Sequence, residues 1–150
     1  TEGEVLQFKG IPNFSPELFR YVVNADPLKS KQLAKGIDQL MDEGVAQLFI
    51  GKHSGRKIIG TVGQLQFEVI QYRLEHEYGA KCRYEPIRLH KTAWFVSDNK
   101  TQLEDFRARK ASQIALDKEG REVFMADTPF ALQMAQEKYP DIHFYFTSEF

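Results

Sequence analysis

The order of elements along this 150-residue chain predicts an α+β fold, a two-layer α/β sandwich in which helices cover one face of an antiparallel sheet. Two segments carry helix start and stop signals, and short apolar runs typical of strands separate them. The order in residues 13–86 is therefore β-α-β-β-α-β, the ferredoxin-like split βαβ arrangement, and residues 87–150 form a second βαββαβ-like half. The sequence does not decide whether the two halves share one sheet.

The first helix is expected to begin at Asp26-Pro27, with Asp as the N-cap and Pro at the first helical position, and to end at Gly44. One face is apolar, and the opposite face carries mixed charges that we interpret as solvent-exposed, with a docking surface as the alternative. The apolar face holds Leu33, Ile37, Leu40 and Met41, and the charged face Lys31, Lys35, Asp38 and Asp42. The strands of this half are expected at Leu18–Val23, Val45–Ile50, Lys57–Thr61 and Lys81–Tyr84.

The second helix is expected between Gly63 and Gly79, since the first is typical of the turn before a helix and the second of the left-handed residue that closes one. At about 100° per residue its apolar side chains form two arcs, roughly opposite each other. One arc holds Phe67, Ile70, Leu74 and Tyr78, and the other Leu65, Val69 and Tyr72. A helix over a sheet needs only one apolar stripe. The second stripe must therefore meet either a neighbouring helix in the same layer or a domain outside this chain.

The second half shows the same kinds of signal. Its strands are expected at Ala93–Val96, Ile114–Leu116, Glu122–Ala126 and Ile142–Phe146, with a turn at Asp117–Gly120. One helix is expected from an N-cap among Ser97, Asp98 and Asn99 to about Lys110, and another from Thr128-Pro129 to Pro140.

Composition argues against several functional classes. Twenty basic and twenty-one acidic residues give a net charge of −1, without the basic excess of a dedicated RNA binder. No apolar run is long enough to span a membrane. The single cysteine, Cys82, is expected to be a small core residue; the alternative is a reactive thiolate with a pKa lowered by Lys81 and Arg83.

Motifs for catalysis, nucleotide binding and metal binding are missing from the sequence. The only Gly-Lys pair, Gly51-Lys52, is followed by His53 and lies in a hairpin turn, so it does not fit a phosphate-binding loop. The four histidines, His53, His76, His90 and His143, are far apart. We therefore expect no catalytic residue, no cofactor-binding residue and no metal ligand in this chain.

Basic clusters remain as candidates for contact with RNA, because exposed Lys and Arg side chains can neutralise phosphates. The first lies in the hairpin turn and comprises Lys52, His53, Arg56 and Lys57. The second follows the central helix and includes Lys81, Arg83, Arg88, His90 and Lys91. A third, formed by Arg107, Arg109 and Lys110, is better explained by complementation of a helix dipole. The late aromatics Phe144, Tyr145 and Phe146 are interpreted as core and strand residues.

Gly60–Gly79, GTVGQLQFEVIQYRLEHEYG, resembles the β-turn-α unit in the third domain of translational GTPases such as elongation factor G. The Gln-Leu-Gln-Phe-Glu-Val-Ile form is most similar to the C-terminal domain of bacterial peptide chain release factor 3. Further segments agree in order and spacing: GIPNFSPELFR (10–20), DPLKSKQLAKGIDQL (26–40), Tyr-Glu-Pro (84–86) and AQEKYPD (135–141). One departure is Ala93, where the family usually has an Arg before the residue equivalent to Trp94.

The resemblance implies a domain of a larger GTPase, an expectation with which the start of the chain at Thr1 is consistent. Residues 1–12 would be the end of a preceding β-barrel domain or a linker, and 13–150 the release-factor C-terminal domain, of which 13–86 is similar to domain III of elongation factor G. GTP or GDP with magnesium would bind in the missing nucleotide domain. The factor would promote departure of codon-reading release factors from the ribosome.

In this interpretation the first two basic clusters would contact ribosomal RNA or protein, and Leu65, Val69 and Tyr72 would contact another domain of the same cytoplasmic, monomeric protein. The alternative is a stand-alone ferredoxin-like module that binds a ligand or forms a dimer. A small phosphatase would need a Gly-Arg phosphate loop, which is missing from the sequence.

Overall fold

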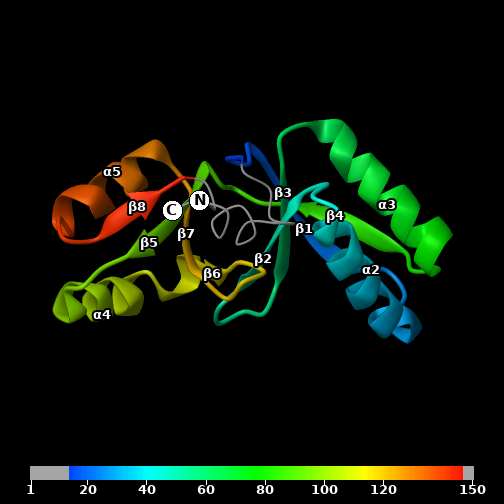
Figure 1. Cartoon of the computed structure of the whole chain (residues 1–150), viewed down its shortest axis with the longest axis horizontal. Helices are drawn as coiled ribbons and strands as arrows, with labels where there is room; N and C mark the ends of the chain where they lie inside the picture. Colours follow the sequence, from blue (N-terminus) through cyan, green and yellow to red (C-terminus); the bar gives the residue numbers. More distant parts are fainter. Residues whose placement is uncertain (1–13, 147–150) are drawn as a thin grey trace, which may run out of the picture.

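The computed structural model describes residues 14–146 and is a mixed α/β structure (Figure 1). In these residues four α-helices accompany an eight-stranded antiparallel sheet. The first half contains β1 (Leu18–Asn24), α2 (Ser30–Asp42), β2 (Gln47–Gly51), β3 (Lys57–Thr61), α3 (Gln64–Tyr78) and β4 (Cys82–Pro86). The second contains β5 (Lys91–Val96), α4 (Lys100–Arg109), β6 (Ile114–Leu116), β7 (Glu122–Ala126), α5 (Pro129–Lys138) and β8 (His143–Tyr145). The segment 1–12, expected to be the end of a preceding β-barrel domain or a linker, lies outside the described residues.

Local signals explain the helix ends. Asp26 accepts a hydrogen bond from the Leu28 backbone N–H and caps a short 3₁₀ turn, Pro27–Lys29, which leads into α2. Asn99 and Thr128 accept from backbone N–H groups at the starts of α4 and α5. Gly79, at φ +63°, closes α3 in the left-handed conformation that glycine adopts at little cost. The predicted helices are thus confirmed, and the first differs only in beginning with a 3₁₀ turn.

One continuous sheet joins the two halves, in the order β4-β1-β3-β2-β6-β7-β5-β8. The first half has the order β4-β1-β3-β2, and the second half has the corresponding order in reverse. The junction is the pairing of β2 with β6, in which Ile50 faces Leu116 and Gly51 faces Ala115. The predicted order β-α-β-β-α-β is confirmed, and the continuity that the sequence left open is settled.

The two helix pairs lie at opposite ends of the molecule, with the strands between them (Figure 1). The pair α2 and α3 covers a core with Ile37, Ile59 and Phe67, while α4 and α5 cover a core centred on Phe106. Each half is therefore a two-layer sandwich. The prediction of two layers does not extend to the whole chain, whose layers run helix, strand, strand, helix.

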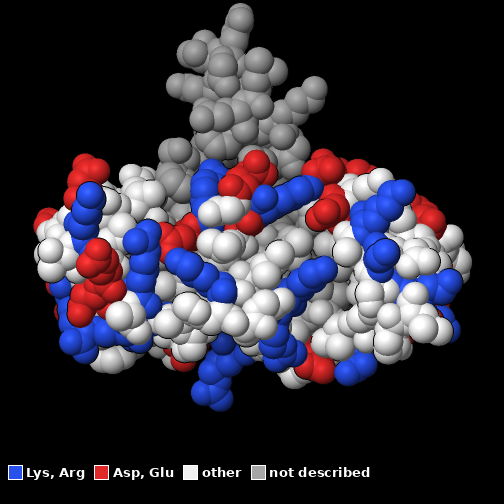
Figure 2. Space-filling model, turned by 90° about the horizontal axis from the view of Figure 1, so that it is seen from below, with Lys and Arg blue, Asp and Glu red and all other residues white. Residues whose placement is uncertain are grey.

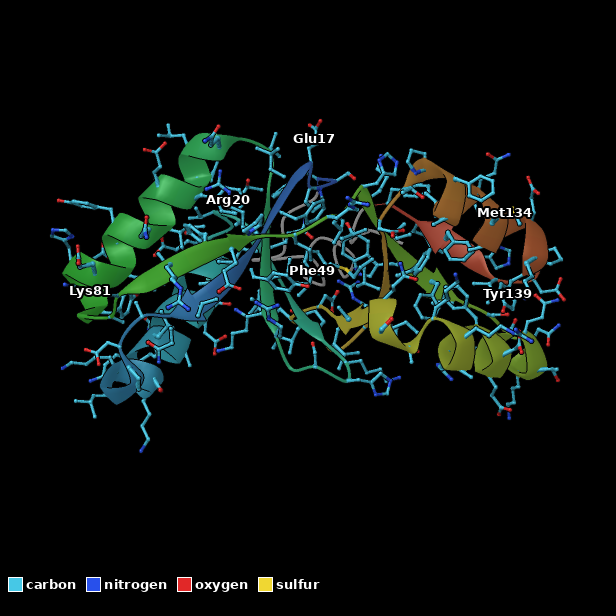
Figure 3. All side chains as sticks on the ribbon, turned by 180° about the vertical axis from the view of Figure 1, so that it is seen from behind. Glu17, Arg20, Phe49, Lys81, Met134 and Tyr139 are labelled. Carbon is cyan, nitrogen blue, oxygen red and sulfur yellow. The ribbon has the colours of Figure 1, made fainter. Side chains whose placement is uncertain are left out.

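A third core joins the helix-free faces of the two halves, and we call this contact the seam. Its buried members are Phe19, Phe49, Ile58, Trp94, Ala115, Val123 and Met125. Phe49 lies in the middle of the molecule (Figure 3), and its ring centre is 5.8 Å from that of Trp94. Since β2 and β5 are not neighbours in the sheet, this contact requires the sheet to curl back on itself. Burial of both faces explains why the central strands have consecutive apolar residues.

Candidate functional site

Helix α3 exposes one of its two apolar arcs to solvent. Phe67, Ile70 and Leu74 are completely buried against the sheet. In contrast, Leu65 is 67% exposed, Tyr72 63% and Val69 38%. We call these three residues, together with the neighbouring Val62, the α3 stripe. Tyr72 also stacks on His76, with ring centres 4.0 Å apart, so the stripe ends in an ordered aromatic pair.

The neighbouring helix does not cover this stripe. Helix α2 packs against the other side of α3, where Gly36 approaches Leu74 and Tyr78 so closely that a Cβ at position 36 would lie 2.7 Å from a Leu74 methyl. Tyr78 also donates a hydrogen bond to the Gln39 side chain. The expectation that a helix in the same layer would cover the second arc is therefore wrong. Within residues 14–146 the stripe has no cover.

Two of the candidate cations in the β2–β3 turn are engaged by acidic side chains. Lys52 lies 2.9 Å from Glu122, a carboxylate that Arg107 of α4 also contacts. Arg56 lies 2.7 Å from Glu85, and its guanidinium stacks 3.6 Å above the Tyr21 ring. These pairs tie the turn to the rest of the sheet, so both cations have structural roles.

The contacts of Glu122 with Arg107 and Lys52 also change the pKa of its carboxyl. Burial alone would raise the pKa of its carboxyl, but the hydrogen bonds from Arg107 and Lys52 outweigh burial and lower it. Arg107, which we assigned to complementation of a helix dipole, thus pairs with β7 instead. Arg109 of the same cluster pairs with Asp105 on its own helix.

The second basic cluster is dispersed in the structure. Lys81 lies at the outer end of the first half (Figure 3), 3.8 Å from Glu75. Arg83 lies 3.5 Å from Glu85, and Lys91 lies 5.3 Å from the centre of the Phe146 ring. Figure 2 shows Lys and Arg side chains across the whole width of one face, with Asp and Glu side chains among them. The sequence clusters therefore do not merge into one basic patch.

Three of the candidates, His53, Lys57 and Arg88, make no ion pair with another described residue. Arg88 lines a cleft of about 220 Å³ where the two halves meet, which we call the seam cleft. Tyr21 of β1, Ser54 of the β2–β3 turn and Gln113 of the 3₁₀ turn before β6 also line it. The sequence analysis missed this cleft, because it depends on how the halves pack.

Two further expectations concern single positions. Cys82 is buried, and burial raises the pKa of its thiol to about 11, while a hydrogen bond with Tyr84 lowers it less. The core interpretation is confirmed, and the alternative of a lowered thiol pKa is wrong.

Ala93 is completely buried in the core under α4 and α5, so no cation occupies that position. Among the late aromatics, Phe144 packs against Phe106, while Tyr145 is 37% exposed.

Within residues 14–146, no group of His, Cys, Asp and Glu side chains converges as a metal site would require, and no helix could cross a membrane. The sequence matches a known family, described as class II release factor RF3, C-terminal domain, over residues 8–136. This match covers most of the chain and confirms the resemblance found in the separate segments. The chain belongs to the class II release factor RF3 C-terminal domain family.

Proposed function

We propose that this chain docks a GTP-dependent peptide chain release factor on the ribosome and couples that contact to the other domains of the factor. Its family gives the chain a release-factor-related role in translation. In the proposed mechanism the whole factor promotes departure of codon-reading release factors after peptide release. GTP hydrolysis, with GTP or GDP and magnesium, takes place in a separate nucleotide domain.

The α3 stripe is the observation that carries the coupling role. Leu65 and Tyr72 are both more than half exposed on a helix whose opposite side is completely buried. Exposed apolar side chains grouped on one face mark an interaction site more often than a free surface. In a factor with several domains, the partner we propose is another domain of the same protein. A change in that contact would move the C-terminal domain as a unit.

Side chains without ion-pair partners near the β2–β3 turn support the docking role. His53, Lys57 and Arg88 carry cationic or titratable groups without an ion-pair partner among the described residues. Ribosomal RNA presents phosphates, which Lys and Arg side chains neutralise with release of counterions. We therefore favour Lys57 and Arg88 over Lys52, Arg56, Lys81 and Arg83, whose charges are already matched by carboxylates.

The remaining parts of the proposal concern architecture and location. The strand orders suggest that each half is a ferredoxin-like split βαβ unit. We propose a monomer in the cytoplasm, with ribosomal RNA, ribosomal protein and the nucleotide and β-barrel domains as direct partners. Codon-reading release factors would be indirect partners.

Co-sedimentation of the purified chain with ribosomes across a salt series tests docking. We expect binding that weakens with salt, and a smaller salt dependence for Arg88→Gln and Lys57→Gln, because each phosphate contact adds about 0.7–0.9 to the slope. Lys100→Gln, a change at an exposed residue at the start of α4, is the matched control. Equal salt slopes for all variants would rule out these residues as phosphate contacts.

The coupling role requires the full-length factor. Leu65→Ser combined with Tyr72→Ser is expected to reduce GTP-dependent recycling while the purified C-terminal chain stays folded, since both side chains are exposed. Unchanged recycling would refute the use of the stripe. A stable dimer of the chain that the same changes dissociate would favour the alternative, a stand-alone dimerisation module.

A further inference from the structure

The seam cleft gathers unpaired polar side chains over an apolar floor. Arg88, Ser112, Gln113 and Asp127 all line it, and none of the four side chains makes a hydrogen bond or ion pair with another described residue. They come from the segment between β4 and β5, the 3₁₀ turn before β6, and the end of β7. Side chains that converge without partners from three separate segments are typical of a binding site.

The floor of the cleft is buried and apolar. Ile58, Ala115 and Met125 line it, and each is at most 7% exposed because it belongs to the seam. A volume of about 220 Å³ is below the range of roughly 300–1,000 Å³ that drug-sized ligands occupy. The cleft therefore suits one flat group of a larger partner, held between aliphatic surfaces.

We infer that the seam cleft accepts one unstacked nucleobase of a single-stranded segment of ribosomal RNA, with Arg88 on a flanking phosphate. This inference rests on the proposed ribosome-docking function. Sequence-specific proteins bind RNA mainly at single-stranded loops, where a splayed base can stack on protein and hydrogen-bond through its edge. The polar groups of the cleft match such an edge.

The donor and acceptor set of the cleft matches the hydrogen-bonding edge of a nucleobase. Asp127, when ionised, only accepts hydrogen bonds, and Gln113 both donates and accepts. An amino group on cytosine, adenine or guanine, or the imino N3–H of uracil, can donate to the Asp127 carboxylate while a neighbouring acceptor of the base accepts from Gln113. An apolar peptide side chain would desolvate Gln113 and Asp127 without replacing their hydrogen bonds with water. A base therefore fits the cleft better than an apolar peptide side chain does.

The charge around the cleft agrees with this choice. Arg88 is the cation that lines the cleft, which it shares with the carboxylate of Asp127. His53 lies in the β2–β3 turn beside Ser54 of the cleft, whereas Lys57 alternates with Ile58 and therefore points to the other face of β3. A phosphate beside a bound base would meet the Arg88 guanidinium there.

NMR titration of the 150-residue chain with short single-stranded RNA tests the inference. We expect oligocytidylate to bind about tenfold more tightly than an abasic oligonucleotide of the same length, with shifts at the Gln113 side-chain amide. Asp127→Ala should reduce this preference, because it removes the acceptor for the donor of the base. Ser112→Trp fills the cleft from an exposed position and should abolish both effects, while Thr101→Trp on the exposed side of α4 should not. Equal binding of the two oligonucleotides, or normal binding by Ser112→Trp, would overturn the inference.

Ribosome co-sedimentation with the same variants separates this inference from the proposed function. If wild type and Ser112→Trp bind ribosomes equally, docking stands and the nucleobase site is refuted. If wild type binds neither ribosomes nor oligonucleotides, both proposals fail. A photocrosslinking residue at position 112 identifies the occupant: a crosslink to ribosomal RNA supports the inference, and one to a ribosomal protein contradicts it.

Discussion

Replacing Phe67 with alanine tests whether the two halves of the chain unfold as one unit. Phe67 lies on α3 in the first half, and its side chain is completely buried. Its ring meets Tyr84 edge-on at 5.2 Å, and the Arg20 guanidinium lies 4.6 Å from its centre. The coupling that we propose needs α3 and the second half to move together, so this property bears directly on function.

The structure gives the size of the effect. Truncation of a buried Phe to Ala costs about 3–5 kcal/mol, and loss of an aromatic pair places the cost in the upper part of that range. Because urea lowers the unfolding free energy by about 1–3 kcal/mol per molar, the midpoint should fall by roughly 1–5 M. Val69→Ala on the exposed arc of the same helix is the matched control, and its effect should stay within about 0.5 kcal/mol.

The assay uses the only tryptophan of the chain, which reports from the other half. Trp94 is completely buried in the seam, and its indole N–H donates to Asp117 at 2.9 Å. If the chain is one cooperative unit, Phe67→Ala should lower the fluorescence midpoint of Trp94 as much as the midpoint from circular dichroism. A Trp94 transition that stays at its wild-type midpoint would refute the reasoning and show that the halves unfold independently.

Three further predictions concern individual contacts. Cys82 should resist thiol reagents at about pH 8 until the chain unfolds, because burial raises its pKa to about 11; rapid labelling of the folded chain would contradict this. The carboxyl of Glu122 has a lowered pKa through Arg107, so its contribution to stability is present above the unfolded value of 4.5 and is lost as the pH falls through the folded value. Denaturation at several pH values should therefore show a smaller acid loss for Glu122→Gln than for wild type. Gly36→Ala should lower the melting temperature, since contact with Leu74 at 2.7 Å outweighs a gain in helix propensity of about 1 kcal/mol.

Elements governed by local chemistry could be predicted from the sequence. The cap residues Asp26 and Asn99 and the closing Gly79 act on backbone groups within a few residues, so their patterns define helix ends directly. The two arcs of α3 also followed from periodicity, and the structure confirms that one is buried. The sequence could not predict which side of α3 the neighbouring helix would cover. The close approach at Gly36 depends on how α2 and α3 pack in three dimensions.

The seam and its cleft could not be predicted because they depend on contacts between distant residues. Pairing of β2 with β6 involves only two residue pairs, and the contact of Phe49 with Trp94 joins strands that are not neighbours. The charge pairing was unpredictable for the same reason, since Lys52 and Glu122 are 70 residues apart. The consecutive apolar residues of the central strands were the available signal, because burial of both faces implies a second layer on the helix-free side.

The α3 stripe and the seam cleft lie on opposite faces of the first-half sheet. In β1, Val22 points into the core beneath α2 and α3, while its neighbour Tyr21 lines the cleft. A domain on the stripe and an RNA base in the cleft could therefore bind at the same time without touching.

This geometry distinguishes a rigid connector from an internal switch. If the domain moves as a rigid body, Leu65→Ser and Ser112→Trp should affect ribosome affinity additively, within about 0.5 kcal/mol, because distant sites without shared partners act independently. A larger coupling energy in a double-mutant cycle would require a second arrangement of the sheet between the two sites. Since both sheet faces are buried by tightly packed cores, we expect additivity, and the mechanical step would then lie at the contact of the stripe with the domain that we propose as its partner.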